Sequence, residues 1–410
     1  MSHLDQQDAR DWSPDGWRAV LPSLAVALSM GAVFTAFLGV LLVAAETVGL
    51  SDGEVNGWII AGFGIPGLMG FVLTWRYRIP LLVTGNAFII IFIARLGTEF
   101  SWPELVGASL IAGVAVLIMV PLGLTRAVSR LLPAPIVFGL LAGAVLPFIV
   151  DMFSTLGDER LIVGGAIAVY LVGKAWWEPR VPAILPALVT AVLIAVLSGR
   201  VDVDSSGSTV LAPVFTAPEF SLTAILTVAP VMLVLITVQA NIPSMIFLRE
   251  QGYEPPERLI TVLSGTGTVG ASVLGPVGLS LSLPATAYSA GPDAGPTATR
   301  YWAVLMGSTI LFAYGLLAGF AALISDILPA AVLIAVAGLA LLGVMADALK
   351  KITAGPLTWG PLFAFAITLS DLTLFGFGPF FWAIAGGIAV SFLIERSAWR
   401  SIQPAVQSSS

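Results

Sequence analysis

The sequence predicts an all-α integral membrane protein with fourteen transmembrane segments, arranged as two inverted repeats of seven. Three observations indicate this fold: the composition, the distribution of positive charge and a weak internal repeat. Of the 410 residues, 58% are hydrophobic and only 10% are charged, whereas soluble domains carry about 25% charged residues. The apolar runs approach the ~20 residues that a spanning helix needs, and they lack the short alternating strands of a transmembrane β-barrel.

Hydropathy gives the expected elements in order. The first repeat covers 19–199 and the second 220–396, with a polar loop at 200–219 and tails at 1–18 and 397–410. The predicted segments are 19–45, 55–75, 79–95, 104–124, 131–152, 160–177, 181–199, 220–248, 259–274, 276–290, 300–324, 327–347, 357–375 and 378–395. The third and the tenth are short and interrupted.

The positive charges support this number of segments. With a cytoplasmic N-terminus, 15 lysines and arginines fall in inner loops, and 3 fall in outer loops, namely Arg95, Arg160 and Arg200. Since cytoplasmic loops carry the excess of positive charge, we expect both termini in the cytoplasm. Residues 1–17 lack the basic start of a signal peptide, so the first apolar run is interpreted as a retained span.

The two halves resemble each other weakly at an offset of 196 residues. Pro80 matches Pro276, Asp151 matches Asp347, and a Leu-Pro-Ala run recurs at 132–134 and 328–330. Because each half has an odd number of spans, the halves must be inserted in opposite orientations. Inverted repeats are typical of transporters, whose substrate site lies at the repeat interface near the middle of the membrane.

The third and tenth segments are predicted to be discontinuous. Each begins with a proline and an extended piece, reaches polar residues and then becomes helical; the alternative is a pair of kinked continuous helices. Two half-helices of opposite direction would point their N-termini at each other. Each N-terminus carries free N–H groups and partial positive charge, so the pair would bind an anion without a cationic side chain.

The candidate substrate-binding residues come from the first, third, eighth and tenth segments. We expect backbone N–H groups to bind a carboxylate, amides and hydroxyls to orient it, and two phenylalanines to cover an aromatic ring. The proline at 284 also suits the first turn of a half-helix. The alternatives are interhelical hydrogen bonds for the amides and close helix packing for the small residues. The candidates are Ser29, Phe34, Thr84, Gly85, Asn86, Ala87, Phe88, Gln239, Asn241, Ser280, Ser282 and Pro284.

The composition excludes several kinds of site. The chain has no cysteine, and its single histidine, His3, lies in the N-terminal tail. A thiolate or histidine metal site and a cysteine or histidine catalytic group are therefore excluded. We expect no enzymatic activity, no metal, no other cofactor and no nucleic-acid partner. Residues 79–94, 220–248, 259–292 and 301–325 carry no charge, which favours an anionic or neutral polar substrate over a cation.

Five acidic residues lie near predicted span ends, where solvated interface residues are the default interpretation: Glu46, Asp151, Asp326, Asp347 and Asp371. Asp151 and Asp347 are repeat mates. Asp151 is the candidate for proton coupling. Lys350 and Lys351 stand close to Asp347, which suggests an interfacial salt bridge.

Four stretches resemble the benzoate/proton symporter family: RYRIP at 76–80, NIPSMIFLREQGYEPP at 241–256, GPVGLSLSLPATAYSAGPDAGP at 275–296 and LFGFGPFFWAIAGG at 374–387. The resemblance implies the inverted-repeat fold shared with nucleobase permeases and sulfate/bicarbonate-type anion carriers. In that fold, spans 1–4 and 8–11 form a core domain that moves against a gate domain of spans 5–7 and 12–14. The resemblance also implies proton-coupled secondary transport of an aromatic carboxylate, and a homodimer in the lipid.

Two departures from the family pattern lie where substrate would be recognised. Ala240 separates Gln239 from Asn241, and Ser244 replaces a glycine. The run Val83-Thr84-Gly85-Asn86-Ala87 replaces a Trp-Ser-Thr-Pro-Gly-like run. The eighth and tenth spans also lack the glutamates with which nucleobase permeases grip a base. The predicted function is transport of a small organic anion, with benzoate-like acids first. The alternatives are an inorganic oxyanion transporter of the same fold and a passive anion channel.

Overall fold

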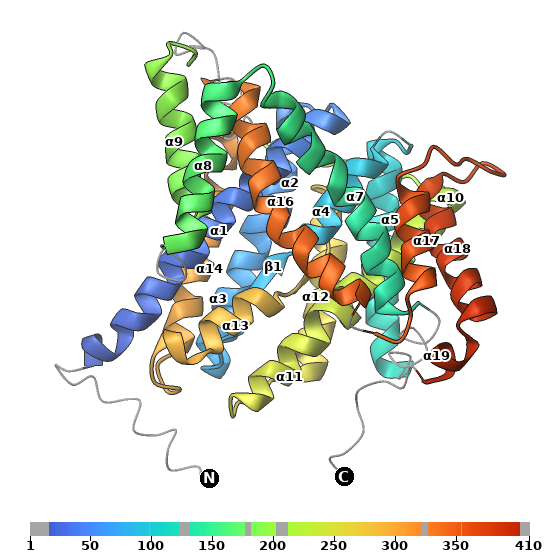
Figure 1. Cartoon of the computed structure of the whole chain (residues 1–410). Coiled ribbons are helices and arrows are strands. Elements are labelled where there is room, and N and C mark those ends of the chain that lie inside the picture. The colour runs from blue at the N-terminus through green and yellow to red at the C-terminus, as the bar shows by residue number, and fades with distance from the viewer. Residues whose placement is uncertain are drawn as a thin grey trace.

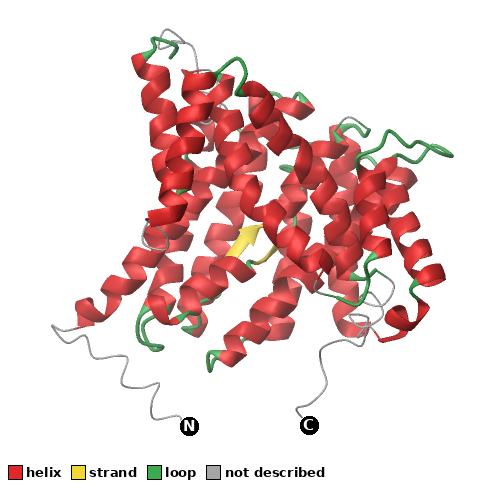
Figure 2. Ribbon diagram, viewed as in Figure 1, coloured by secondary structure: helices red, strands yellow, loops and turns green. Residues whose placement is uncertain are grey.

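The computed structural model describes residues 16–97, 99–122, 132–176, 182–201, 212–320, 327–353 and 355–401. Several predictions lie outside these ranges: most of both tails, including His3, the centre of the loop at 200–219, and Asp326. Within them the chain is mostly helical (Figure 2). Each predicted apolar segment coincides with a helix, or with a strand followed by a helix.

Six helical stretches of the described chain are long and apolar enough to cross a membrane. They are Val20–Val48, Asp52–Tyr77, Trp102–Met119, Ala134–Thr155, Leu222–Glu250 and Ala330–Thr353. The helices that form these stretches are α1 (Gly16–Val48), α2 (Asp52–Ile59), α3 (Ile65–Tyr77), α5 (Trp102–Leu122), α7 (Ala134–Thr155), α10 (Leu222–Val234), α11 (Ile242–Glu250) and α16 (Ala330–Thr353). A chain with this many apolar stretches is a multi-pass membrane protein.

The remaining helices are shorter. They are α4 (Ala87–Leu96), α8 (Arg160–Trp176), α9 (Ile184–Leu197), α12 (Glu257–Ser272), α13 (Leu283–Ala290), α14 (Tyr301–Leu316), α17 (Trp359–Thr368), α18 (Pro379–Ile394) and α19 (Arg396–Ser401). Single 3₁₀ turns occur at η4 (Pro292–Ala294) and η5 (Ala318–Phe320). In Figure 1, α8 and α9 stand beside α16 on one side of the molecule, while α17 and α18 lie together on the other.

Two of the long helices are interrupted by π-helical turns. The π-helix η2 (Ile60–Gly64) joins α2 to α3, and η3 (Leu235–Asn241) joins α10 to α11. In both cases a proline follows in the first turn of the next helix, Pro66 and Pro243. A proline cannot donate a backbone hydrogen bond, and a π-turn is a common way to absorb such a break, frequently at functional sites.

A short two-stranded sheet lies near the middle of the molecule (Figures 1 and 2). Strand β1 (Val83–Gly85) pairs antiparallel with β2 (Leu279–Leu281), and Thr84 is opposite Ser280. Each strand leads directly into a short helix, β1 into α4 and β2 into α13. The third and tenth segments are therefore each an extended strand followed by a short helix, as predicted, and the two strands run in opposite directions.

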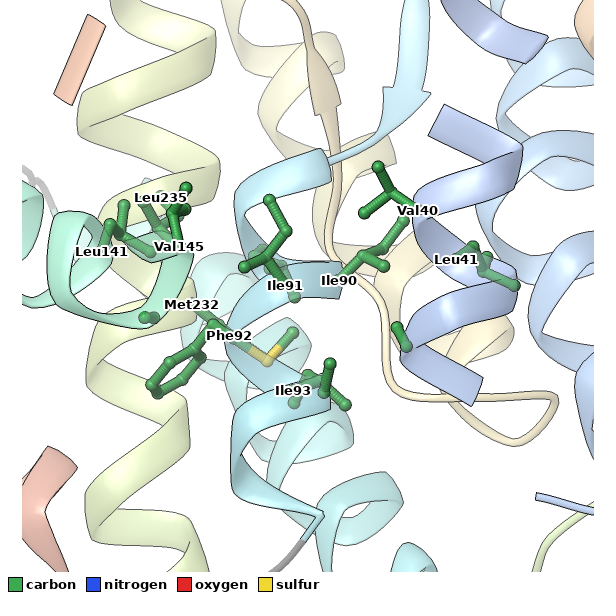
Figure 3. Packing of buried hydrophobic residues seen from close by; sticks show 14 of the residues in the cluster. Val40, Leu41, Ile90, Ile91, Phe92, Ile93, Leu141, Val145, Met232 and Leu235 are labelled. Carbon is green, nitrogen blue, oxygen red and sulfur yellow. The ribbon is translucent and has the colours of Figure 1, made fainter. Parts of the chain in front are cut away.

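Helix α4 is buried on every side. Residues Ile89 to Ala94 are at most 3% exposed, and they pack against α1, α7 and α10, as Figure 3 shows. Four consecutive large apolar residues, Ile90 to Ile93, account for this burial, because a helix that is hydrophobic all round is buried. Their packing fixes the position of the α4 N-terminus relative to α7 and α10.

Candidate substrate site

A cluster of uncharged polar side chains surrounds the point where the two strands become helices. The Asn86 amide nitrogen lies 3.3 Å from Gln239 Oε1 and 3.4 Å from Ser280 Oγ. It also donates to the Leu235 carbonyl oxygen at 3.2 Å. All three side chains are at most 7% exposed. The structure thus joins three predicted residues from three different segments, and we call them the amide cluster: Asn86, Gln239 and Ser280.

Asn86 also caps its own helix. Its side-chain oxygen accepts a hydrogen bond from the Phe88 N–H at 3.1 Å, and its backbone N–H donates to the Gly278 carbonyl at 2.9 Å. Asparagine is among the best residues for this position because its oxygen satisfies a free N–H of the first turn. One of the backbone donors predicted to bind a carboxylate at α4 is therefore already occupied.

The N-terminus of α13, unlike that of α4, has no side-chain cap. Ser282 precedes the helix in an extended conformation, and its side chain makes no capping hydrogen bond. Pro284 lies in the first turn, as predicted, and is exposed. Ser282 is half-buried, so the first turn of α13 borders accessible space. Of the two half-helices, α13 is the one whose N-terminus remains without a side-chain cap.

Asn241 has a different role from its neighbours in the sequence. Its side-chain oxygen accepts from the Leu281 N–H at 2.9 Å, and its nitrogen donates to Ser264 Oγ at 3.0 Å. The residue is 1% exposed. Asn241 therefore ties β2 to α12, which matches the alternative of an interhelical hydrogen bond.

Several hydroxyl groups that were not predicted from the sequence form hydrogen bonds with backbone groups in and just before β2, on the side that does not pair with β1. Thr268 Oγ1 accepts from the Leu279 N–H at 2.9 Å, and Ser109 Oγ lies 3.2 Å from both the N and the O of Val277. Ser109 also contacts Ser272 Oγ at 2.9 Å. Irregular backbone is tolerated in a membrane only when protein groups satisfy it. The available signal was the spacing of Ser264, Thr268 and Ser272, since residues four apart share one helix face.

Three predicted residues in the third segment have mainly structural surroundings. A Cβ atom on Gly85 would lie 2.5 Å from the Gly62 carbonyl oxygen in η2, so a larger residue does not fit there. Thr84 and Ala87 are half-buried beside the cluster. Gly85 is thus explained by the close approach of β1 to η2, and Thr84 shares its sheet face with Ser280.

The aromatic candidates lie on different helices. Phe88, in the first turn of α4, is half-buried and packs edge to face against Phe138 of α7, with ring centres 6.0 Å apart. Lys351 of α16 lies over the other ring of this pair, with its Nζ 4.4 Å from the Phe138 ring centre. Phe34 is 5% exposed within the apolar core that includes α1. Phe88 therefore borders the amide cluster directly, through its N–H bond to Asn86.

In the part of the chain that the structure describes, no hydrogen bond joins Ser29 or Asp151 to the amide cluster. Ser29 donates to the Ala25 carbonyl of its own helix at 3.0 Å. Asp151 is exposed near the end of α7. In α1, it is Thr35 that reaches another helix, through a 2.6 Å contact with the Tyr314 hydroxyl.

The far end of α13 is anchored by the motifs at 251–256 and 291–300. Arg300 is 9% exposed and donates to the carbonyl oxygens of Ala290 at 2.6 Å and Gly295 at 2.7 Å. The Tyr253 hydroxyl donates to the Thr297 carbonyl at 2.8 Å. Burial raises the pKa of Tyr253 to about 12, against an opposing effect of Arg300, so this hydroxyl stays protonated and able to donate. A cation at the C-terminal end of a helix is stabilising.

Comparison with known proteins identifies the family. The family described as benzoate membrane transport protein matches residues 20–393. The chain belongs to this family. Two curated relatives are similar to the chain over most of their length. The inner membrane protein YdcO of Escherichia coli (strain K12) is 26% identical over 355 residues, 84% of this chain and 88% of YdcO. The benzoate membrane transport protein of Acinetobacter baylyi is 25% identical over 371 residues, 89% of this chain and 93% of that protein.

Solved structures show which fold the benzoate transport family shares. SLC26A9 is similar at a TM-score of 0.60 with 15% sequence identity, over 92% of this chain but only 65% of that longer one. The transmembrane domain of the bicarbonate transporter BicA, from a cyanobacterium, is similar at a TM-score of 0.52 with 16% identity, over 94% of this chain and 98% of that one. The chain is a membrane transporter, not an enzyme, with the fold of these transporters.

Proposed function

We propose that the protein is a secondary active transporter of a small organic anion, and that its substrate is a benzoate-like aromatic carboxylate carried together with protons. The observation that carries this proposal is the amide cluster at the starts of α4 and α13. Its side chains are buried, polar and uncharged. Such a site offers hydrogen-bond donors to an anion, while the half-buried Phe88 ring offers an apolar surface to an aromatic group.

The wider arrangement belongs to the same proposal. Fourteen spans form two inverted repeats, 19–199 and 220–396, with cytoplasmic termini in a bacterial inner membrane. Spans 1–4 and 8–11 form a core that carries the site, and spans 5–7 and 12–14 form a gate against which the core moves. The antiparallel pairing of β1 with β2 supports inversion, because it brings the two broken segments together head to head. The protein acts as a homodimer.

Proton coupling uses either the acid form of the substrate or a peripheral carboxylate, with Asp151 as the candidate side chain. Its exposure near the end of α7 leaves it open to exchange protons with water. Asp151→Asn tests the second route. It should abolish uptake driven by a pH gradient and leave substrate exchange intact, whereas normal gradient-driven uptake would assign the proton to the substrate.

A second candidate cargo is an inorganic oxyanion such as bicarbonate or sulfate. The observation in its favour is the similarity of fold to a structure described as a bicarbonate transporter. A passive anion channel is the other alternative, and saturable exchange of substrate across the membrane would exclude it.

One experiment separates these functions. The purified protein is screened by thermal shift against benzoate, substituted aromatic acids, nucleobases, sulfate and bicarbonate, and hits are followed by uptake into proteoliposomes with and without a pH gradient. We expect stabilisation by aromatic acids and uptake that increases when the outside is acidic. Stabilisation by oxyanions alone would contradict the organic-acid proposal.

A further inference from the structure

Lys351 is a half-buried cation between two helices. It lies in the last turn of α16, and its ammonium group sits 4.4 Å from the centre of the Phe138 ring on α7. Phe138 itself is 4% exposed. Positive charge over an aromatic face is attracted by the ring electrons, so this contact holds the lysine side chain in a defined place.

The salt bridge predicted for this lysine is not formed. Among the described residues, no ion pair joins Asp347 to Lys350 or Lys351. Asp347 is exposed one turn earlier on α16 and acts on Lys351 only through a longer-range electrostatic interaction. The Phe138 ring is the contact that the structure shows for the Lys351 ammonium. An ammonium group has three hydrogen-bond donors, and a ring face satisfies none of them fully. The electrostatic interaction with Asp347 is not a hydrogen bond, so these donors can still bind an anion.

The lysine is connected to the amide cluster by two aromatic rings. Phe138 packs edge to face against Phe88 at 6.0 Å, and the Phe88 N–H is bonded to Asn86 Oδ1. A continuous series of contacts thus runs from α16 through α7 to the start of α4. The amide cluster itself contains no charged side chain. Lys351 therefore brings a cation to the two rings beside an otherwise neutral site.

We propose that Lys351 is a substrate-binding residue that pairs with the carboxylate of an aromatic acid while the acid's ring packs against Phe88 and Phe138. This inference rests on the proposed function and names a residue outside the two broken segments. The chemistry matches both parts of such a substrate: a cation for the carboxylate, and aromatic edges and faces for the ring. A half-buried ammonium attracts an anion more strongly than one in bulk water, because the effective dielectric constant is lower.

The test compares Lys351→Met with Lys350→Met, which removes the neighbouring exposed lysine. Each purified variant is titrated with benzoate and with benzamide, a neutral molecule of similar shape, by thermal shift. We expect Lys351→Met to weaken benzoate binding by about tenfold or more, the loss typical of a charge-assisted contact. Lys350→Met should bind benzoate normally, Lys351→Arg should keep most of the affinity, and benzamide binding should be the same in all variants.

The result that would overturn the proposal is an unchanged benzoate affinity in Lys351→Met, or an equal loss for benzoate and benzamide. Gel filtration and the melting temperature without ligand identify a misfolded variant, in which case Lys351→Gln replaces it. If the wild-type protein binds bicarbonate or sulfate instead of benzoate, the proposed function is wrong but the same variants are titrated with that anion. A tenfold loss of affinity for that anion in Lys351→Met then supports Lys351 as the binding cation. An unchanged affinity, or a wild-type protein that binds no anion at all, refutes the proposal.

Discussion

At the scale of single residues, Asn86 has an observed structural role and a proposed binding role. Its oxygen caps α4 and its nitrogen faces Gln239 and Ser280. Asn86→Asp keeps the cap, since aspartate is an equally good N-cap residue, but places a negative charge where the anion is proposed to bind. Repulsion of a few kcal/mol at short range is expected even in a screened site. Benzoate affinity should fall by roughly a hundredfold in thermal-shift titrations. The melting temperature without benzoate should fall too, because the new oxygen faces the acceptor oxygens of Leu235 and Gln239. Unchanged affinity would place the substrate elsewhere.

Glu395 gives a residue-scale prediction about pH. Its carboxylate accepts the N–H groups of Trp359 and Gly360 at 2.9 and 3.1 Å and contacts Ser391 Oγ at 2.9 Å. Burial opposes its ionisation, but these hydrogen bonds, with that from Thr358, hold its pKa below the ordinary value of 4.5. Glu395 thus contributes stability above pH 4.5, which is lost as the pH falls through the lowered pKa.

Glu395→Gln should therefore lower the stability of the protein at pH 7 by about 1 kcal/mol, a value discounted for solvent exposure. The difference in melting temperature between wild type and variant should shrink as the buffer is made acidic. A difference that stays constant with pH would show that the charge of the carboxylate does not matter. Glu250→Gln, at an exposed glutamate, is the control and should have little effect at either pH.

The residue scale also shows how far the sequence could predict the site. Segment hydropathy and proline placement identify Asn86, Gln239 and Ser280 as polar residues in otherwise apolar spans. They do not reveal that Asn86 caps its own helix or that Asn241 bonds to β2, because those roles depend on which segments meet in space. The same reason applies at Lys351. Charge spacing along one helix predicts a salt bridge with Asp347, but Asp347 acts on Lys351 only at longer range, and the direct contact is with Phe138 of α7.

At the scale of elements, the free edge of β2 is the feature that hydropathy could not show. A strand with one paired edge leaves backbone groups that must find other partners inside a membrane. Here they find hydroxyl and amide groups on α5, η3 and α12. The prediction of a strand followed by a helix was correct for both broken segments, because proline and small polar residues act locally. The π-turns η2 and η3 were missed, since a π-turn differs from a kinked helix only in its hydrogen bonds.

Thr268→Val tests the importance of that edge. The variant keeps the shape of the side chain but leaves the buried Leu279 N–H without its acceptor. We expect a loss of about 1–3 kcal/mol in stability, measured as a lower melting temperature, and weaker substrate binding because β2 leads into α13. The control is Thr266→Val, two residues away on the exposed side of α12, where the hydroxyl bonds only within its own helix. Equal effects of the two substitutions would exclude a special role for the β2 edge.

At the scale of the whole molecule, the proposed movement of core against gate can be tested with introduced cysteines, since the chain has none of its own. Phe92 of α4 and Phe380 of α18 meet at a ring distance of 5.6 Å across the proposed core–gate boundary. Phe63 of η2 and Tyr314 of α14 meet at 6.0 Å within the proposed core. A ring-centre distance does not give the Cβ–Cβ separation of about 3.8 Å that a disulfide needs, so each cysteine pair is joined with a short bifunctional thiol reagent whose bonds a reductant breaks. A cross-link across a moving boundary should stop transport, whereas one inside a rigid body should not. We therefore expect cross-linking of F92C/F380C to block uptake into proteoliposomes and a reductant to restore it, while F63C/Y314C keeps its activity in both states. Uptake that continues in fully cross-linked F92C/F380C would refute the movement of these two helices relative to each other and would leave a fixed pore as the better description of the molecule.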